Sequence, residues 1–267
     1  MTTSLDDLLT ESDRVTARLK TVFKGAMPHN KVVLVNALRS VLGEHDGDRD
    51  WIKANISAII GGFEDSAHKA YRIAEADAQG RALRDVFGGM VRSDAPASEL
   101  LDVVARNGGA IDAFCLGVAQ SRKSRAGAAL ETCLAYLFDS LGYPYSASPV
   151  INGKPDFVFP SVERYREHAT DCIVFTSKRT LRERWRQIIT EGARGAHFFL
   201  ATLDPDVRAP DLQEMRENRV NLVVPEGIRA GRYAAHPNVI SFESFVLDYA
   251  EPAMARWRRN GVIAPAP

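Results

Sequence analysis

The stretch of sequence that decides the fold of this chain runs from Gly153 to Glu191 and reads GKPDFVFPSVERYREHATDCIVFTSKRTLRERWRQIITE. It opens with the pair Pro155-Asp156 and the apolar run Phe157–Phe159, and a second apolar run leads into Lys178. Short apolar runs of this kind predict buried strands, and the residues Thr180–Glu191 predict a helix. An acid and a lysine at the ends of neighbouring strands, with a second acid on the next helix, can converge on one divalent metal ion.

Downstream of this stretch, strands continue to alternate with helices. Further strands are predicted at 197–202, 220–224 and 239–242, with helices near 210–217 and towards Trp257. This alternation predicts the α/β class, with a central mixed five-stranded sheet flanked by helices.

The N-terminal part of the chain predicts helices from about Leu5 to Arg122. We expect one helix to break at Gly61-Gly62 and the next to cover about Ser66 to Ala78. The basic segment Gln120–Gly127 is expected to be a turn, followed by a long helix that stops at Gly142. We therefore predict an N-terminal helical subdomain over 1–117 and a catalytic domain over 118–267.

Composition sets few limits on function. The chain has 267 residues and a formal net charge of zero, so any affinity for nucleic acid must come from local clusters of cations. The three cysteines, Cys115, Cys133 and Cys172, are far apart in apolar contexts and are expected to be buried free thiols in a reducing compartment. The polar N-terminus argues against a secretory signal, and the apolar runs are short, so we expect a soluble, cytoplasmic protein.

The chemistry predicted for the central stretch is phosphodiester hydrolysis. Asp156 is suited to bind a metal ion directly, and Lys178 could donate hydrogen bonds to the attacking water and to the phosphate. Glu191 could complete the metal site, and Glu131, on the preceding helix, could join through a metal-bound water or hold a second ion. Each residue also has an ordinary explanation: a turn aspartate, a lysine that points to solvent and glutamates on a solvated helix face.

The residues after Lys178 favour a nucleic-acid substrate. Five cations fall within nine positions, interrupted by Glu183: Lys178, Arg179, Arg182, Arg184 and Arg186. Arginine pairs with guanine and glutamate with the cytosine amino group, so an Arg-Glu-Arg run at a helix start could read two neighbouring G·C pairs. We expect Trp185, Ile188 and Ile189 to face the core.

These motifs resemble the type II restriction endonucleases related to EcoRII (its C-terminal catalytic domain), SsoII and PspGI. The pattern of that family runs P-D, (S/T)-x-K, R-(D/E)-R and a helical E, and this chain has Pro155-Asp156, Thr176-Ser177-Lys178, Arg182-Glu183-Arg184 and Glu191 in the same order. The upstream segment Ser121–Gly127, with Glu131 after it, is similar to the family's DNA-contacting segment and its accessory acid.

The resemblance implies a restriction-endonuclease-like core of the PD-(D/E)xK type and assigns roles to residues. Asp156, Lys178 and Glu191 would be the catalytic set with Glu131 as accessory acid, and Asp156, Glu191 and Glu131 would be the metal ligands. The DNA-binding residues would be Arg182, Glu183, Arg184, Gln120, Arg122, Lys123 and Arg125. If the central bases are flipped out of the stack, Trp51 or Tyr71 could assist, although core positions are the commoner role for both.

The same resemblance implies cofactors and partners. The metal would be Mg²⁺, with Mn²⁺ as a substitute. The enzyme would act as a homodimer on double-stranded DNA, without a membrane. A cognate DNA methyltransferase would protect host sites and is not expected to bind the protein directly.

The leading hypothesis is Mg²⁺-dependent cleavage at CCNGG or CCWGG sites that leaves 5′ overhangs. A restriction enzyme for a CCGG core, a PD-(D/E)xK repair or recombination nuclease, and a catalytically silent DNA-binding regulator are the alternatives. A nuclease that reads DNA structure needs phosphate contacts more than base contacts, which argues against the repair nuclease. A silent regulator has no need of all three catalytic residues.

Overall fold

The computed structural model describes residues 5–151, 154–181 and 197–265, and the side chains of 5–10 and 123–127 lie outside this description. The chain divides into two compact units. The helical unit comprises Met1–Ala37 and Ser66–Ala128, and the sheet unit comprises Leu38–Asp65 and Ala129–Pro267. Each unit has its own hydrophobic core, and each is described separately below.

The helical unit confirms the prediction of helices from Leu5 onwards. It is built from α1 (Leu5–Ala26), the start of α2 (Asn30–Leu42), the later part of α3 (Arg49–Gly88), α4 (Ala97–Arg106) and the earlier part of α5 (Gly108–Leu141). Its core gathers apolar residues at helical spacing from four of these helices: Val15, Leu19, Phe23, Ala78, Ala82, Val86, Phe87, Val103, Phe114 and Val118.

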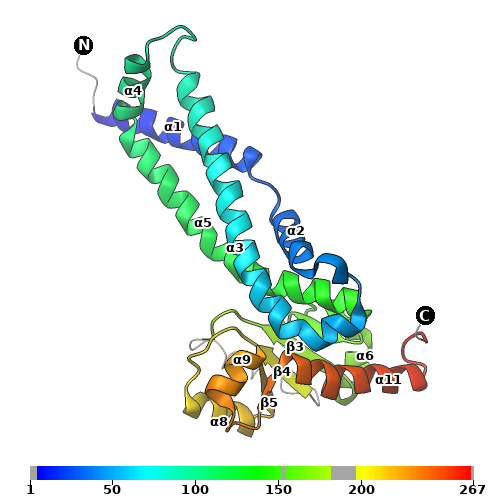
Figure 1. Ribbon diagram of the computed structural model, residues 1–267. Coiled ribbons are helices and arrows are strands. Elements are labelled where there is room, and N and C mark those ends of the chain that lie inside the picture. Colours follow the sequence, from blue (N-terminus) through cyan, green and yellow to red (C-terminus); the bar gives the residue numbers. More distant parts are fainter. Residues whose placement is uncertain (1–4, 152–153, 182–196, 266–267) are drawn as a thin grey trace. The chain divides into compact units, whose positions relative to one another are not determined.

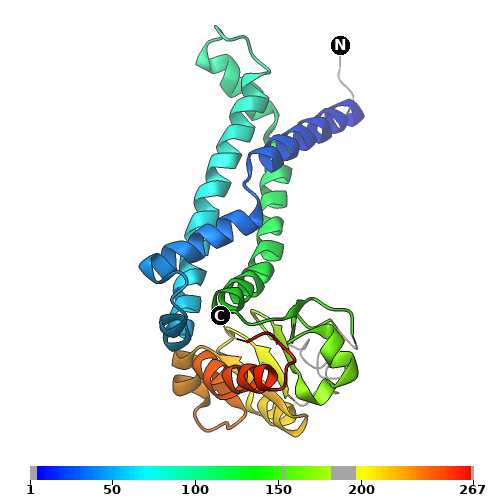
Figure 2. The same cartoon turned by 90° about the vertical axis from the view of Figure 1, so that its right-hand side faces the viewer.

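Helix α3 does not break at Gly61-Gly62, so the predicted interruption is wrong (Figure 2). Glycine weakens a helix by only about 1 kcal/mol, and packing on both sides of the pair outweighs that cost. Ile59, Ile60 and Phe63 are all buried. A Cβ atom on Gly62 would lie 3.2 Å from the side chain of Val41 in α2, so this glycine permits close packing of Val41 against α3.

The predicted basic turn at 120–127 is also wrong, because α5 runs through it without a break. This segment contains neither proline nor a glycine pair, so its helical propensity is intact. The helix ends at Leu141 as predicted, and Gly142 adopts the left-handed conformation with φ +71°. The Tyr143 N–H donates to Phe138 O and the Gly142 N–H to Asp139 O, the two bonds of a Schellman cap.

The sheet has six strands in the order β1-β2-β3-β4-β5-β6, and not the five expected. They are β1 (Ser146–Ala147), β2 (Phe157–Phe159), β3 (Ile173–Ser177), β4 (His197–Ala201), β5 (Val220–Val224) and β6 (Val239–Ser241). Strand β1 has only two residues and therefore leaves no alternating pattern. The sheet is mixed as predicted: β1, β2 and β3 pair antiparallel, and β3 to β6 pair parallel.

Both faces of this sheet are apolar, because alternate side chains point to opposite faces. One face carries Val158, Val174 and Leu200 and packs with Leu212 and Met215 of α8 (Ala209–Glu217). The other face carries an aromatic cluster in which the Phe138 ring of α5 lies 5.2 Å from Phe157, 5.1 Å from Phe159 and 5.6 Å from Phe175. The C-terminal half of α5 is thereby fixed against β2 and β3.

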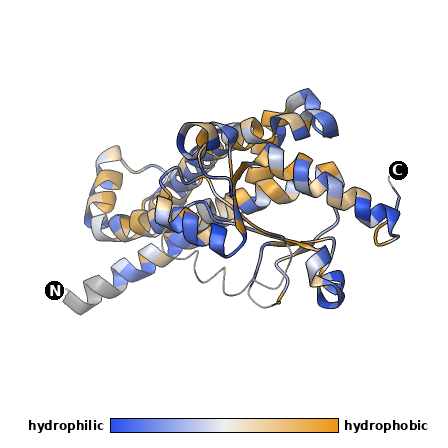
Figure 3. Cartoon of the chain, turned by 90° about the horizontal axis from the view of Figure 1, so that it is seen from below, coloured by the Kyte–Doolittle hydropathy of each residue, from blue (hydrophilic) through white to orange (hydrophobic). Residues whose placement is uncertain are grey.

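The remaining elements of the sheet unit surround this sheet (Figure 1). They are η1 (Gly43–His45), α6 (Val162–Glu167), η2 (Ala169–Asp171), α9 (Glu226–Ile228), η4 (Arg229–Tyr233), α10 (Phe242–Ser244), η5 (Phe245–Ala250) and α11 (Glu251–Arg259). Figure 3 shows that the helices carry both hydrophobic and hydrophilic residues, as expected for helices that pack on one side only. Within the described ranges, none of the helices combines the length and the apolarity needed to cross a bilayer.

The two compact units do not coincide with the division predicted at residue 117. Residues Leu38–Asp65 group with the sheet, and residues up to Ala128 group with the N-terminal helices. The reason is that α3 and α5 are long, and each of them has one part in the helical unit and the other part in the sheet unit.

One of the three predictions for the cysteines is wrong. Cys133 and Cys172 are buried, whereas Cys115 is exposed because its neighbour Phe114 occupies the buried position on α5.

Candidate active site

The pairing of β2 with β3 brings Asp156 and Lys178 together. The strands are antiparallel with Phe157 opposite Phe175, so the start of β2 lies beside the end of β3. Asp156 immediately precedes β2, and Lys178 immediately follows β3. The two residues are 22 positions apart in the chain but are adjacent in space, as the sequence predicted.

The carboxylate of Asp156 is held by hydrogen bonds from the end of β3. Its Oδ2 atom accepts the Ser177 N–H at 2.6 Å, the Ser177 hydroxyl at 2.8 Å and the Thr176 hydroxyl at 3.3 Å. The residue is buried, with 8% of its surface exposed. Because Oδ2 is engaged by three donors, the carboxylate is fixed in orientation and its Oδ1 atom is turned towards Lys178.

Lys178 is the exposed partner of this pair. Its Nζ atom lies 3.7 Å from Asp156 Oδ1, and 44% of its side chain is exposed. The backbone of Lys178 is fixed, since its N–H donates to Ala201 O at the end of β4. A lysine with a fixed backbone and an accessible ammonium group can reach an oxygen of a bound phosphate.

Glu131, on α5, belongs to the same cluster of charges. Burial and the nearby charge of Asp156 raise the pKa of Glu131, and the charge of Lys178 and a hydrogen bond with Ser148 partly offset this. Ser148 itself lies beside Asp156, because its N–H donates to Asp156 O at 2.8 Å. The prediction of an apolar environment for Glu131 is therefore incomplete, because two charged groups also act on it.

These residues meet the chemical requirements of a hard divalent cation. Such ions prefer carboxylate oxygens, and the mutual repulsion of Glu131 and Asp156 would be relieved by a cation between them. In the part of the chain that the structure describes, no group of three or more His, Cys, Asp or Glu side chains forms a metal site. The third predicted ligand, Glu191, lies outside the described residues.

The predicted DNA-binding residues are less fully described. Arg182, Glu183 and Arg184 lie outside the described residues, as do the side chains of Lys123 and Arg125. Gln120 is exposed on α5. Arg122 is engaged within the helical unit, where its guanidinium donates to both oxygens of the buried Glu75 and its Nε lies 2.9 Å from Oε1. For Arg122 to contact DNA, its ion pair with Glu75 would have to open, or the guanidinium would have to bind a phosphate while it stays paired with Glu75.

Arg179, one of the five cations within 178–186, is paired with a glutamate of the sheet unit. Its Nε lies 2.9 Å from Oε2 of Glu64, which belongs to the part of α3 inside the sheet unit. Sequence reasoning missed Glu64 because nothing in the chain relates residues so far apart. It also gave no role to Ser177, although the hydroxyl residues of the Thr-Ser-Lys motif were a usable signal for a carboxylate partner.

The two aromatics considered as helpers in base flipping have other contacts. The Trp51 ring stacks on His45 with ring centroids 4.2 Å apart. The Tyr71 hydroxyl donates to Asn30 O at 3.4 Å. Both residues are half-buried, and their proposed role in base flipping remains a prediction.

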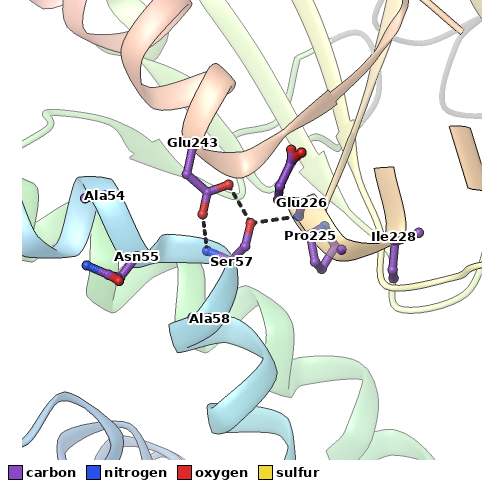
Figure 4. Close-up of a pocket in the computed structure, with 9 residues that line it drawn as sticks. Ala54, Asn55, Ser57, Ala58, Pro225, Glu226, Ile228 and Glu243 are labelled. Carbon is purple, nitrogen blue, oxygen red and sulfur yellow. Dashed lines mark hydrogen bonds between the residues drawn. The ribbon is translucent and has the colours of Figure 1, made fainter. Parts of the chain in front are cut away.

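A separate cavity lies at the edge of the sheet where β5 and β6 end, and the sequence did not predict it. Its volume is about 510 Å³, and its lining includes Ser57, Glu226 and Glu243 (Figure 4). The Ser57 N–H and hydroxyl donate to the two carboxylate oxygens of Glu243, and the Ser57 hydroxyl accepts the Glu226 N–H at 3.0 Å. These bonds attach α3 to the same sheet edge that carries Lys178.

Known proteins match this chain over slightly more than half of its length. The family model described as EcoRII C terminal matches residues 99–246. The chain is 35% identical over 159 residues to the type II restriction enzyme EcoRII of Escherichia coli, an alignment that covers 55% of this chain and 38% of that enzyme. It is 29% identical over 156 residues to the type II restriction enzyme SsoII of Shigella sonnei, covering 54% of this chain and 51% of that enzyme. The chain thus spans about half or less of the length of these curated relatives.

Two solved structures have a similar fold. One is metal-depleted Ecl18kI in complex with uncleaved DNA, with a TM-score of 0.73 and 22% identity over 96% of this chain and 88% of that chain. The other is a complex of the restriction endonuclease PspGI with substrate DNA, with a TM-score of 0.60 and 18% identity over 86% of this chain and 94% of that chain. The likeness agrees with the predicted α/β restriction-endonuclease core.

Proposed function

The chain belongs to the EcoRII C-terminal family, whose model covers more than half of it, and on that premise we propose that it is a type II restriction endonuclease. It would hydrolyse phosphodiester bonds of double-stranded DNA at a short palindrome with CC and GG elements. The observation that carries this proposal is the convergence of Asp156, Lys178 and Glu131 beside the end of β3 in a chain of this family.

Hydrolysis needs the attacking water to be oriented and the charge that develops on the phosphate to be stabilised. The ammonium group of Lys178 supplies a positive charge and hydrogen-bond donors at an accessible point 3.7 Å from Asp156. Its backbone is held by Ala201, so the donor is placed before substrate binds. Glu131 and Asp156 provide acceptors that can orient a water molecule or remove a proton from it.

We infer that Asp156 and Glu131 would hold a divalent cation, with Glu191 as a further ligand. When bound, Mg²⁺ would lower the pKa of a coordinated water and neutralise charge on the phosphate, and Mn²⁺ would substitute. The three hydrogen bonds to Asp156 Oδ2 leave Oδ1 as the atom suited to this ligation. Glu131 would contribute only in its ionised form, so its raised pKa makes activity sensitive to acid.

Sequence recognition would fall to the Arg182-Glu183-Arg184 run, by arginine contacts to guanine and a glutamate contact to cytosine. Gln120, Arg122, Lys123 and Arg125 would contact the DNA further out. A homodimer would present one such set to each half of a palindrome and one catalytic site to each strand. The proposed sites are CCNGG or CCWGG, cut before the first C to leave 5′ overhangs.

Digestion of plasmid DNA tests this proposal directly. Purified protein with Mg²⁺ should yield discrete fragments, and sequencing of their ends should place every cut at a CC/GG palindrome with a 5′ overhang. Omission of Mg²⁺ or addition of a chelator should abolish cutting, and Mn²⁺ should restore it. Sedimentation should give the mass of two copies of the chain.

Other results would point elsewhere. Cuts at CCGG without a central base pair would change the site but keep the class of enzyme. Random nicking, or cutting that depends on branches and ends, would favour a repair nuclease. Tight binding without any cutting would reject the proposal in favour of a silent regulator.

A further inference from the structure

The main chain that follows Lys178 is tied to the loop after β4 by a set of hydrogen bonds. The Lys178 N–H donates to Ala201 O at 2.8 Å. The Thr202 hydroxyl donates to Arg179 O at 3.3 Å, and Asp204 Oδ2 accepts the Leu181 N–H at 3.1 Å. Within four residues, three points of the chain leaving β3 are therefore bound to residues that follow or end β4.

Thr202 is placed to act on this chain and not on solvent. The residue has 0% exposure, and its own N–H donates to Val223 O of β5 at 2.9 Å. Its hydroxyl also accepts the Asp204 N–H at 3.1 Å. The Thr202 hydroxyl thus links Arg179 O to the Asp204 N–H, and the backbone of Thr202 is itself held by its hydrogen bond to β5.

Asp204 is held from two directions. Its Oδ1 atom accepts the Asp206 N–H at 3.0 Å, an Asx-type turn that sets the orientation of the carboxylate. The Tyr233 hydroxyl accepts the Val207 N–H at 2.8 Å and donates to Asp204 O at 3.5 Å, which fixes the backbone of the loop. The second oxygen, Oδ2, is thereby presented to Leu181, a core residue with 3% exposure.

We propose that Thr202 and Asp204 form a positioning clamp that fixes the main chain from Arg179 to Leu181 and thereby sets the placement of Lys178 against Asp156. The inference rests on the proposed function for its effect on cleavage. Neither residue needs to touch DNA or metal. They would act through the strand end, because a displacement of about 1 Å at a reacting group can cost on the order of 100-fold in rate.

Leu181 is also the last residue before the Arg182-Glu183-Arg184 run. The helix expected from Thr180 does not include Thr180 and Leu181, which are not helical, and its remaining residues lie outside the described ranges. Asp204 accepts the Leu181 N–H, so the clamp would also set the direction in which the chain leaves Leu181. Loss of the clamp should therefore reduce both the cleavage rate and the preference for the cognate site.

Substitutions with matched controls test the clamp. Asp204→Ala removes both carboxylate bonds, and Asp204→Asn keeps only one acceptor oxygen. Asp206→Asn, in the same loop, leaves the backbone N–H that Asp204 accepts. Thr202→Val removes the hydroxyl while keeping the shape, and Thr202→Ser restores the hydroxyl.

Single-turnover cleavage of a cognate duplex and of one with a single mismatch should separate these variants. Asp204→Ala and Thr202→Val should cut the cognate duplex at least about tenfold more slowly and discriminate less, whereas DNA affinity without a catalytic metal ion should change by less than about threefold. Asp206→Asn should match the wild type, and Thr202→Ser should recover most of the rate. The clamp would be overturned if Asp204→Ala cleaved the cognate duplex and discriminated against the mismatch as well as the wild type does. It would also be overturned if Asp206→Asn lost as much rate and discrimination as Asp204→Ala.

Amide hydrogen exchange gives a readout that does not depend on cleavage. The Leu181 amide should be protected in the wild type and in Asp206→Asn, and should exchange faster in Asp204→Ala and Thr202→Val. If the wild type cut no discrete site, the proposed function would fail while the exchange of Leu181 would still decide the clamp. Unchanged protection in Asp204→Ala would reject it.

Discussion

At the scale of single residues, the candidate site is organised by unequal use of the two oxygens of Asp156. Oδ2 is engaged by Thr176 and Ser177, and Oδ1 faces the ammonium group of Lys178. A buried carboxylate needs such partners, because a charge without them is costly to bury. The hydroxyl residues of the Thr-Ser-Lys motif thus have a positioning role, and Lys178 remains accessible for a substrate.

Replacement of Lys178 tests its catalytic role. Lys178→Ala should reduce cleavage by about 100-fold or more, because it removes the positive charge that is proposed to lie next to the scissile phosphate. Sequence-specific binding should persist, since the base contacts are proposed to lie elsewhere. Cleavage assays and mobility shifts with the same duplex measure the two effects. Lys154→Ala, which removes an exposed lysine two positions before Asp156, is the comparison and should retain most of the activity.

The raised pKa of Glu131 predicts a dependence of stability on pH. The folded protein keeps a proton that the unfolded chain has released, so stability should fall as pH rises from the ordinary value of 4.5 through the folded-state pKa. Glu131→Gln should remove this decline, which thermal unfolding between pH 4 and 8 would measure. A bound divalent cation favours the ionised form and should therefore reduce the decline in the wild type. Identical pH profiles for wild type and variant would contradict the assignment.

At the scale of elements, Asp171 joins α6 and α11 to the start of β3. Its carboxylate accepts hydrogen bonds from Arg164 of α6 at 2.8 Å and from Arg256 of α11 at 3.0 Å, and the Trp257 indole N–H donates to Asp171 O. Burial alone would raise the pKa of Asp171, but these bonds outweigh it and lower the pKa below its ordinary value. Asp171 therefore stabilises the fold in its ionised form.

Asp171→Asn should lower the free energy of unfolding at neutral pH by about 1.5–3 kcal/mol, the range for hydrogen bonds to charged groups. Since the folded-state pKa is lowered, this contribution is present above the ordinary value of 3.8 and is lost as pH falls through the folded-state pKa. Denaturant unfolding should thus show a difference from wild type that shrinks in acid. Asp248→Asn, at an exposed position, should change stability little at either pH.

At the scale of the whole molecule, the sheet unit depends on residues that precede the predicted catalytic domain. Ile52, Ile56, Ile59, Ile60 and Phe63 of α3 are all buried and lie within Leu38–Asp65, which groups with the sheet. Ser57 of the same helix bonds to Glu243. A division of the chain at residue 117 therefore cuts through the core of the sheet unit.

A fragment of residues 118–267 should consequently fail to unfold cooperatively, because the surface that those five residues cover would be exposed. A fragment of residues 38–267 keeps all of the sheet unit and should retain a cooperative transition. Calorimetry and near-ultraviolet circular dichroism of both fragments make this comparison. A sharp transition in the shorter fragment would show that the segment Leu38–Asp65 is dispensable.

The sequence by itself determined the local features of this protein: the apolar runs of β2 to β6, the stop of α5 at Gly142, and the acid and lysine at two strand ends. These features depend on periodicity and on backbone conformations that neighbouring residues set. Only the tertiary structure decided that α3 continues through Gly61-Gly62 and that the charge of Asp156 raises the pKa of Glu131. It also decided the ion pairs of Arg122 with Glu75 and of Arg179 with Glu64. The physical reason is that packing and electrostatic partners act between residues far apart in the chain, and no local pattern specifies which distant residue will be the neighbour.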